Sequence, residues 1–272
     1  MNNILTVTHN AGFFSCCTQR LRRIIDFCNV NRICPIVDSS KQFLFYKTDP
    51  SLDITNYFFK DNNEMDIKIN DHIFFSSYKD KVDHHSDQFL DYTSLNLGQI
   101  NPFILKYFQV SDEVNRKINY FEKKYSIEYI NLCSIFYRGG DKFQETLIGS
   151  YEIFIDKAKD VSRQHPNIKF LVQTDDDNFL NKFMESFPGS LYLNELHRTA
   201  NKVAVHYEIP LHLRLNEAIN FLAVTNIVSK SKIIITHSGN CGLWAILFRN
   251  NVNNVIQYLQ NNESDIKVWY GK

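Results

Sequence analysis

From residue 127 onward, short apolar runs alternate with longer amphipathic stretches, and no other feature of the sequence constrains the fold as strongly. Strands that alternate with helices are typical of a parallel sheet covered by helices, the α/β class. The expected strands span residues 130–137, 168–173, 191–193, 233–236 and 254–258. The expected helices span residues 146–163, 176–186, 213–230 and 240–248.

The first 40 residues predict a second, smaller α/β unit. Residues 4–8 and 33–37 have the pattern of short strands, and residues 15–28 between them have helical spacing of apolar side chains. Gly12 lies where the first strand is expected to end. This strand–loop–helix–strand pattern predicts a Rossmann-like N-terminal half.

The middle of the chain connects the two α/β units. Residues 60–101 are polar and irregular, and residues 103–124 have the pattern of a charged helix that leads into the second half. We therefore expect two Rossmann-like halves with parallel sheets that face each other across a cleft. The expected N-terminal domain is 1–120, on the acceptor side, and the C-terminal, nucleotide-binding domain is 121–272.

Charge and cysteine content exclude several classes of function. The 30 basic and 30 acidic residues give a formal net charge of zero, which argues against a general nucleic-acid binder or a polybasic membrane anchor. The six cysteines form no C-x-x-C pair and no zinc-like spacing with histidine. There is no signal-peptide pattern and no apolar window of about 20 residues. We expect a cytoplasmic protein without an integral membrane segment.

The strand expected at 130–137 ends in Arg138-Gly139-Gly140-Asp141-Lys142. Two consecutive glycines let a backbone bend tightly and approach a ligand closely. The planar guanidinium suits a phosphate, the aspartate can orient it, and the lysine adds a point charge. The alternative is a solvated turn with a surface ion pair. Because open parallel sheets bind ligands beyond the carboxyl ends of their strands, the position of this cluster favours a binding role.

A second polar cluster follows the strand expected at 168–173. Thr174 or Asp175 can cap the helix that follows, and Asp176 and Asp177 suit the positive end of its dipole. Asp175 and Asp177 also have the D-x-D spacing of a metal site, as in metal-dependent glycosyltransferases. Capping and metal binding both remain open from the sequence alone.

A third cluster, Thr236-His237-Ser238-Gly239-Asn240-Cys241-Gly242, lies between an apolar strand and a helix. Such a loop at a helix N-terminus presents backbone N–H groups and hydroxyls to an anion. It is neither a dinucleotide fingerprint nor a Walker loop, and neither occurs elsewhere in the chain. A fourth cluster, His9-Asn10-Ala11-Gly12, ends the first strand and is expected to face the other three across the cleft.

Taken together, these clusters resemble the motifs of the GT-B-type fucosyltransferase superfamily: α-1,2- and α-1,6-fucosyltransferases, NodZ and protein O-fucosyltransferases. On the family's H-x-R-R-x-D motif, Phe136 matches the histidine, Arg138 the first arginine, Gly139 the second arginine and Asp141 the aspartate. The resemblance implies a GT-B-like fold and a diphosphate-binding role for Arg138 that is essential for activity. The missing histidine and second arginine indicate a divergent member or a neighbouring family.

The resemblance also implies roles for residues around this motif. Lys142 and Glu145 occupy places similar to a lysine and a proposed catalytic base of the α-1,6 enzymes. An aspartate that helps to bind guanine matches either Glu217 or Asn220. The expected catalytic residues are Arg138, Asp141 and Glu145. The expected donor-binding residues are Asn10, Gly12, Arg138, Lys142, Asp175, Asp176, His206, His237, Ser238, Gly239 and Asn240.

The resemblance implies an inverting glycosyltransferase that needs no metal or other cofactor. Its expected donor is GDP-fucose or a related nucleotide sugar, and its expected acceptor is a glycan or another hydroxyl compound. One alternative is a metal-dependent transferase for another nucleotide sugar, with Asp175 and Asp177 as metal ligands. The other is a protein of the same fold that binds a nucleotide or a glycan without catalysis.

Overall fold

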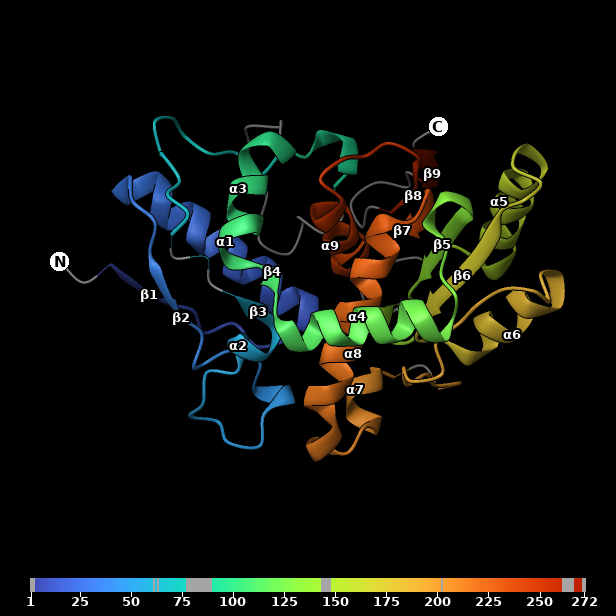
Figure 1. Ribbon diagram of the computed structural model, residues 1–272, viewed down its shortest axis with the longest axis horizontal. Coiled ribbons are helices and arrows are strands. Elements are labelled where there is room, and N and C mark those ends of the chain that lie inside the picture. Colours follow the sequence, from blue (N-terminus) through green and yellow to red (C-terminus); the bar gives the residue numbers. More distant parts are fainter. Residues whose placement is uncertain are drawn as a thin grey trace.

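The computed structural model describes residues 3–60, 62, 64–76, 90–142, 148–201, 203–260 and 267–270. Figure 1 shows the N-terminal segments on the left and the largest sheet on the right, with a long helix between them. Among the described helices, none is long and apolar enough to span a membrane.

The largest sheet has five strands in the order β6-β5-β7-β8-β9. Its first four strands are parallel, and β9 is antiparallel to β8. The strands are β5 (Leu132–Tyr137), β6 (Lys169–Thr174), β7 (Ile233–His237), β8 (Val255–Gln260) and β9 (Lys267–Tyr270). The α/β class with a parallel sheet is thus confirmed, whereas the antiparallel edge strand was not predicted.

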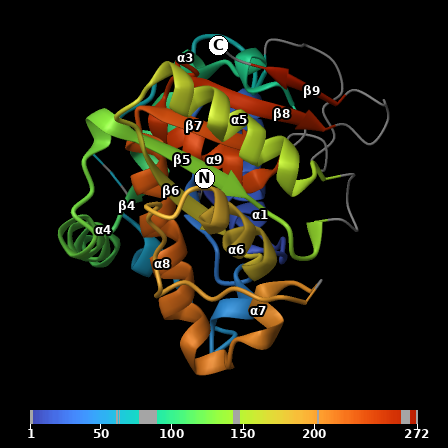
Figure 2. The same cartoon turned by 90° about the vertical axis from the view of Figure 1, so that its right-hand side faces the viewer.

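Both faces of this sheet are covered by helices because its strands are apolar on both sides. In β5, Cys133, Ile135 and Tyr137 belong to one buried cluster and Leu132 and Phe136 to another, as the twofold alternation of strand side chains requires. Helices α5 (Tyr151–Gln164) and α6 (Asp177–Ser186) pack in the first cluster, and α8 (Leu211–Lys230) and α9 (Asn240–Arg249) pack in the second. Figure 2 looks onto α5 and α6 in front of the sheet.

The N-terminal half contains the predicted strand–helix–strand unit. Strands β1 (Ile4–Thr6) and β2 (Ile36–Asp38) pair in parallel, and helix α1 (Phe13–Asn31) connects them. Strands β3 (Phe59–Lys60) and β4 (Gln109–Val110) form an antiparallel pair in the same half. The elements of the whole chain not yet named are η1 (Leu44–Tyr46), α2 (Thr55–Phe58), η3 (Tyr92–Ser94), α3 (Leu97–Tyr107), α4 (Asp112–Lys124), η4 (Tyr129–Asn131) and α7 (Val205–Glu208).

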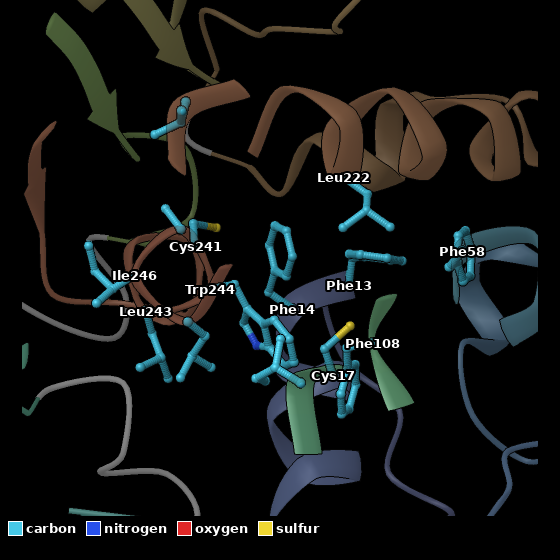
Figure 3. Packing of buried hydrophobic residues seen from close by; sticks show 14 of the residues in the cluster. Phe13, Phe14, Cys17, Phe58, Phe108, Leu222, Cys241, Leu243, Trp244 and Ile246 are labelled. Atoms are coloured by element: carbon cyan, nitrogen blue, oxygen red, sulfur yellow. The ribbon is translucent and has the colours of Figure 1, made fainter. Parts of the chain in front are cut away.

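One hydrophobic core joins the two halves. Phe14 of α1 stacks on Trp244 of α9 with ring centroids 6.0 Å apart, and Phe108 contacts the same indole at 4.8 Å. Phe13 and Leu222 belong to the same cluster, which Figure 3 shows from close by. Because α1 and α9 are fixed by this core, the N-termini of both helices have defined positions.

The region between the two halves differs in detail from the expectation. The helix predicted over 103–124 is two helices, because the chain leaves α3 at Phe108, forms the short strand β4 and restarts at Ser111. Ser111 caps α4 by accepting a hydrogen bond from the backbone N–H of Val114. The expected boundary between residues 120 and 121 falls inside α4.

Candidate active site

The site forms where the order of the strands reverses. The chain passes from β5 to β6 on one side and then returns to β7 on the other side of β5. Ligands of open α/β sheets bind in the crevice at such a point, beyond the carboxyl ends of the two central strands. Arg138 directly follows β5, and His237 is the last residue of β7.

A hydrogen bond to the side chain of His237 links the ends of β5 and β7. The backbone N–H of Arg138 donates to Nε2 of His237 at 2.8 Å, so the ring proton is on Nδ1, which donates to the carbonyl of Ser238 at 2.7 Å. Burial lowers the pKa of His237 to about 4, so the ring is neutral at physiological pH. Both ring nitrogens are engaged with backbone, and the imidazole positions the Arg138 loop.

The guanidinium of Arg138 is held by three groups at the edge of a cavity. Its Nε lies 2.8 Å from Asp175 Oδ2, Nη2 donates to Asp141 Oδ1 at 3.0 Å, and Nη1 lies 3.5 Å from Cys241 Sγ. Burial opposes the charge, but Asp175, Cys241 and Asp141 raise the pKa of Arg138 above its usual range. The side chain keeps 26% of its surface exposed, so an oriented, permanent positive charge faces the cavity.

The two glycines after Arg138 are required by the neighbouring strand end. The backbone N–H groups of Gly139 and Gly140 both donate to Asp175 Oδ1, at 2.9 and 3.4 Å. A Cβ on Gly139 would lie 2.2 Å from Asp176 Oδ2, and one on Gly140 would lie 2.8 Å from Asp175 Oδ2. Glycine at both positions allows this close approach of the two loops.

The aspartates after β6 have structural partners. Asp176 caps α6 by accepting from the backbone N–H groups of Asn178 and Phe179, and its other oxygen accepts from the hydroxyl of Tyr151 at 2.6 Å. Asp177 lies 3.4 Å from Nε of Arg198. In the part of the chain that the structure describes, no group of three or more His, Cys, Asp or Glu side chains is placed to hold a metal ion.

The N-terminus of α9 opens onto the same cavity. Its N-cap, Gly239, has φ +149°, a conformation that favours glycine, and no side chain among the described residues caps the helix. Asn240 is joined to Thr18 of α1 by a hydrogen bond of 2.8 Å. The first turn of a helix has backbone N–H groups without partners inside the helix, and these groups attract an anion.

Two neighbours of Gly239 occupy different places. The buried Lys142 lies beside it, with Nζ 3.8 Å from the point where a Cβ of Gly239 would be. Ser238 lies beneath the loop, where its hydroxyl accepts from Nε2 of Gln257 at 3.0 Å and its backbone N–H donates to Tyr258. Arg138, Lys142 and the first turn of α9 thus concentrate positive charge at one end of the cavity.

The cavity has a volume of about 330 Å³ and is lined by both halves of the chain. Beyond the loops already described, helix α8 contributes Arg214, Glu217, Ala218 and Phe221, which share one helical face. The carboxylate of Glu217 accepts from the backbone N–H of His197 at 2.7 Å, and burial raises the pKa of Glu217. The N-terminal half contributes His9, Ala11, Gly12, Phe13, Phe14, Ser15 and Tyr46.

The structure brings together many, though not all, of the residues predicted from the sequence. Those that line the cavity are Gly12, Arg138, Asp141, Lys142, Asp175, His206, His237, Gly239 and Asn240. Three predicted residues do not line the cavity: Asn10, Asp176 and Ser238. The side chain of Asn10 forms hydrogen bonds with the backbone of Thr8, Lys41 and Leu44 instead. Glu145 lies outside the described residues.

Sequence reasoning named His9 only as part of its loop and did not single out Tyr46, Arg214 or Phe221 as site residues. The spacing of Arg214, Ala218 and Phe221 by four and three residues was a usable signal, because such residues share a helix face. Of the two candidates on α8 for contact with a nucleobase, Glu217 lines the cavity. Asn220 is buried elsewhere, with Nδ2 at 3.5 Å from the carbonyl of Glu195.

This architecture is shared with solved structures of the GT-B fold. The chain is similar to the NodZ α-1,6-fucosyltransferase crystal structure soaked with GDP-fucose, with a TM-score of 0.60, 9% identity and 99% of each chain covered. It is also similar to the crystal structure of fucosyltransferase NodZ from Bradyrhizobium, with a TM-score of 0.58, 9% identity and coverage of 100% of this chain and 99% of that one. No protein-family model and no curated protein matches the sequence.

Proposed function

We propose that this protein is an inverting, metal-independent glycosyltransferase that transfers fucose from GDP-fucose to a hydroxyl of a glycan or similar acceptor. One observation carries the proposal: the oriented guanidinium of Arg138 faces a cavity at the strand reversal, beside Lys142 and the N-terminus of α9. A diphosphate is the ligand chemistry that this arrangement fits. The fold is shared with NodZ, one structure of which was soaked with GDP-fucose.

Arg138 and Lys142 would act on the leaving group. As the bond between the sugar and the diphosphate breaks, negative charge grows on the diphosphate oxygens. Positive groups already in place lower the energy of that transition state without reorganising, and removal of one such group typically costs about 10²- to 10³-fold in rate. Asp141 and Asp175 would keep the guanidinium oriented, since both contact it.

The guanine would lie near Glu217. This half-buried carboxylate lines the cavity from α8. The N1–H and N2–H₂ groups of guanine are adjacent donors that a carboxylate accepts as a pair, whereas the corresponding edges of uracil and cytosine lack this donor pair. The proposal therefore expects GDP to bind more tightly than UDP or CMP. His206, also on the cavity wall, is the predicted further donor contact.

Ligand-dependent melting temperatures test the proposal directly. We expect GDP to raise the melting temperature of the wild-type protein, since a ligand that binds the folded state stabilises it. Arg138→Ala should abolish this shift and fucose transfer, while the exposed Arg116→Ala serves as the matched control and keeps both. Wild-type protein whose melting temperature responds to none of GDP, UDP and CMP would contradict the proposal.

Two other functions make distinct predictions. A transferase with a metal on Asp175 and Asp177 would lose activity in EDTA, whereas the proposed enzyme keeps it. The backbone N–H of Gly139 donates to Asp175 Oδ1, and this contact favours the proposed metal-independent enzyme over the metal-dependent one. The absence of a second arginine at Gly139 is the argument for a non-catalytic binding protein. Such a protein would bind GDP but would not cleave GDP-fucose to GDP and fucose.

A further inference from the structure

The wall that the N-terminal half contributes to the cavity is mostly apolar. Its lining residues are His9, Ala11, Gly12, Phe13, Phe14, Ser15 and Tyr46. Tyr46 is buried, and burial raises its pKa, so it keeps its proton at neutral pH. Among the described residues of this wall, His9 is therefore the side chain that carries a basic ring nitrogen.

An inverting transfer needs a proton acceptor on one particular side of the sugar. This inference rests on the proposed function. The acceptor oxygen attacks the anomeric carbon from the face opposite the departing diphosphate, so its proton must be removed on that face. The diphosphate would be held by Arg138 and the first turn of α9, both from the C-terminal half. The base is then expected on the wall that the N-terminal half supplies.

Most other proton-accepting groups of the cavity are committed elsewhere. Asp141 and Asp175 contact the guanidinium of Arg138, and both ring nitrogens of His237 engage backbone. The carboxylate of Glu217 accepts a hydrogen bond from the backbone N–H of His197, at the end of the cavity where the nucleobase would lie. Burial lowers the pKa of His206, which makes its ring a weaker base than an ordinary histidine. The charged and titratable side chains that line the cavity with His9 are Tyr46, Arg138, Asp141, Lys142, Asp175, His197, His206, Arg214, Glu217, His237 and Cys241.

We propose that His9 accepts the proton of the attacking hydroxyl and that Ser15 positions its ring. Nε2 of His9 and Oγ of Ser15, one turn into α1, form a hydrogen bond of 3.0 Å. When Ser15 accepts from Nε2, the basic nitrogen of the neutral ring is Nδ1, and the same bond stabilises the imidazolium once the proton has arrived. The hydroxyl proton moves to His9, the oxygen bonds to the anomeric carbon, and GDP leaves with the electrons of the broken bond.

The release of GDP from GDP-fucose tests His9 without an identified acceptor. With water as the acceptor, a base must remove a proton, whereas the azide anion attacks without losing one. We expect His9→Ala to lower water-supported release about 10²-fold or more and to leave azide-supported release at the wild-type rate. The melting shift with GDP should stay unchanged, which shows that the fold and donor binding are intact.

Two further variants separate His9 from its rivals. Glu145→Gln removes the base predicted from the sequence and is compared with His9→Ala in water and in azide, because the base is the residue whose loss azide reverses. Ser15→Ala should move the acidic limb of the pH–rate profile to lower pH, because the imidazolium loses a partner, and a merely structural role of Ser15 would not move that limb.

The outcomes distinguish this inference from the proposed function. An active wild type with an equally active His9→Ala variant overturns the role of His9 alone, and so does a His9→Ala variant that azide does not restore. A strong loss in Glu145→Gln that azide restores would assign the base to Glu145 instead. Wild-type protein that binds GDP but releases none from GDP-fucose, with water or azide, overturns the proposed function and the role of His9 with it.

Discussion

The loops that follow β5 and β6 lie next to each other and are both strongly polar, yet their side chains have different roles. After β5, Arg138 directs its charge toward the cavity, and two glycines bring the backbone close to its neighbour. After β6, Asp175 holds that backbone and Asp176 caps a helix. A polar cluster at a strand end can thus face a cavity or support the loop that does.

Among changes to the support of Arg138, the largest effect is expected when Asp175 is removed. Asp175→Ala takes away the acceptor of two backbone N–H groups and the partner of Arg138 Nε, so the guanidinium loses its orientation. We expect kcat/KM to fall about 10²-fold, since a displacement of about 1 Å has effects of this size. Asp175→Asn keeps the hydrogen-bond acceptor but not the charge, and should recover part of the loss.

Asp177→Ala is the matched control, because this carboxylate is nearby and pairs only loosely with Arg198. It should keep activity within about twofold, as is usual for a surface substitution. Equal losses of activity in Asp175→Ala and Asp177→Ala would show that the two carboxylates act as a pair, as in a metal site. That result would contradict the supporting role given to the loop after β6.

The histidine that ties β5 to β7 predicts a pH dependence of stability. The folded protein holds His237 with a pKa of about 4, whereas the unfolded ring titrates near its ordinary value of 6.5. Between these values the unfolded state binds more protons, so stability is present above pH 6.5 and falls as the pH drops toward 4, by about 3 kcal/mol. Urea unfolding at several pH values measures this slope.

His237→Gln provides the comparison for this slope. A glutamine side chain can accept from Arg138 and donate to Ser238, as the neutral ring does, but it does not titrate. Its unfolding free energy should depend less on pH between 6.5 and 4 than that of the wild type. Parallel pH dependences of the two proteins would show that the buried ring does not cause the loss.

A methyl group at Gly139 tests the close approach of the two loops. Gly139→Ala places a Cβ 2.2 Å from Asp176 Oδ2, so one loop must move, and we expect a destabilisation of about 1–3 kcal/mol with a loss of GDP binding. At Gly189 a Cβ would meet no atom within 4 Å, and Gly189→Ala is the matched control. Thermal unfolding with and without GDP separates the two; equal stability of both variants would disprove the contact.

The smallest effect is expected at the helix cap. Asp176→Ala removes the acceptor for the backbone of Asn178 and Phe179, which should lower the unfolding free energy by about 1 kcal/mol. Transfer activity should change little below the melting temperature. If Asp176→Ala abolished GDP binding while the protein stayed folded, Asp176 would be a ligand of the donor, as the family resemblance implied.

The sequence predicted the parts of the fold that depend on local patterns. Apolar runs located β5, β6 and β7, and the position of Arg138 after a buried strand was enough to place it at the edge of the cavity. The break in the helix predicted over 103–124 was missed because Phe108 and Val110 continue the apolar pattern while the backbone forms β4. The antiparallel β9 was also missed, since pairing direction is not encoded locally.

Contacts between loops could not be predicted in this way. That Gly139 faces Asp176, or that both ring nitrogens of His237 engage backbone, depends on which strands lie side by side. The sequence left capping and metal binding open for the aspartates after β6, and only the hydrogen bonds of Asp176 assign it to the helix. His9 was grouped with its loop, but its pairing with Ser15 needed the fold.

The contact between Gly139 and Asp176 also limits how the chain can change. An arginine does not fit at position 139 by one substitution, because its side chain would have to enter the space that the aspartate fills. Replacing the aspartate first removes the N-cap of α6, at a cost of about 1 kcal/mol. The two positions are therefore epistatic, and a second guanidinium at position 139 requires a change at position 176 as well.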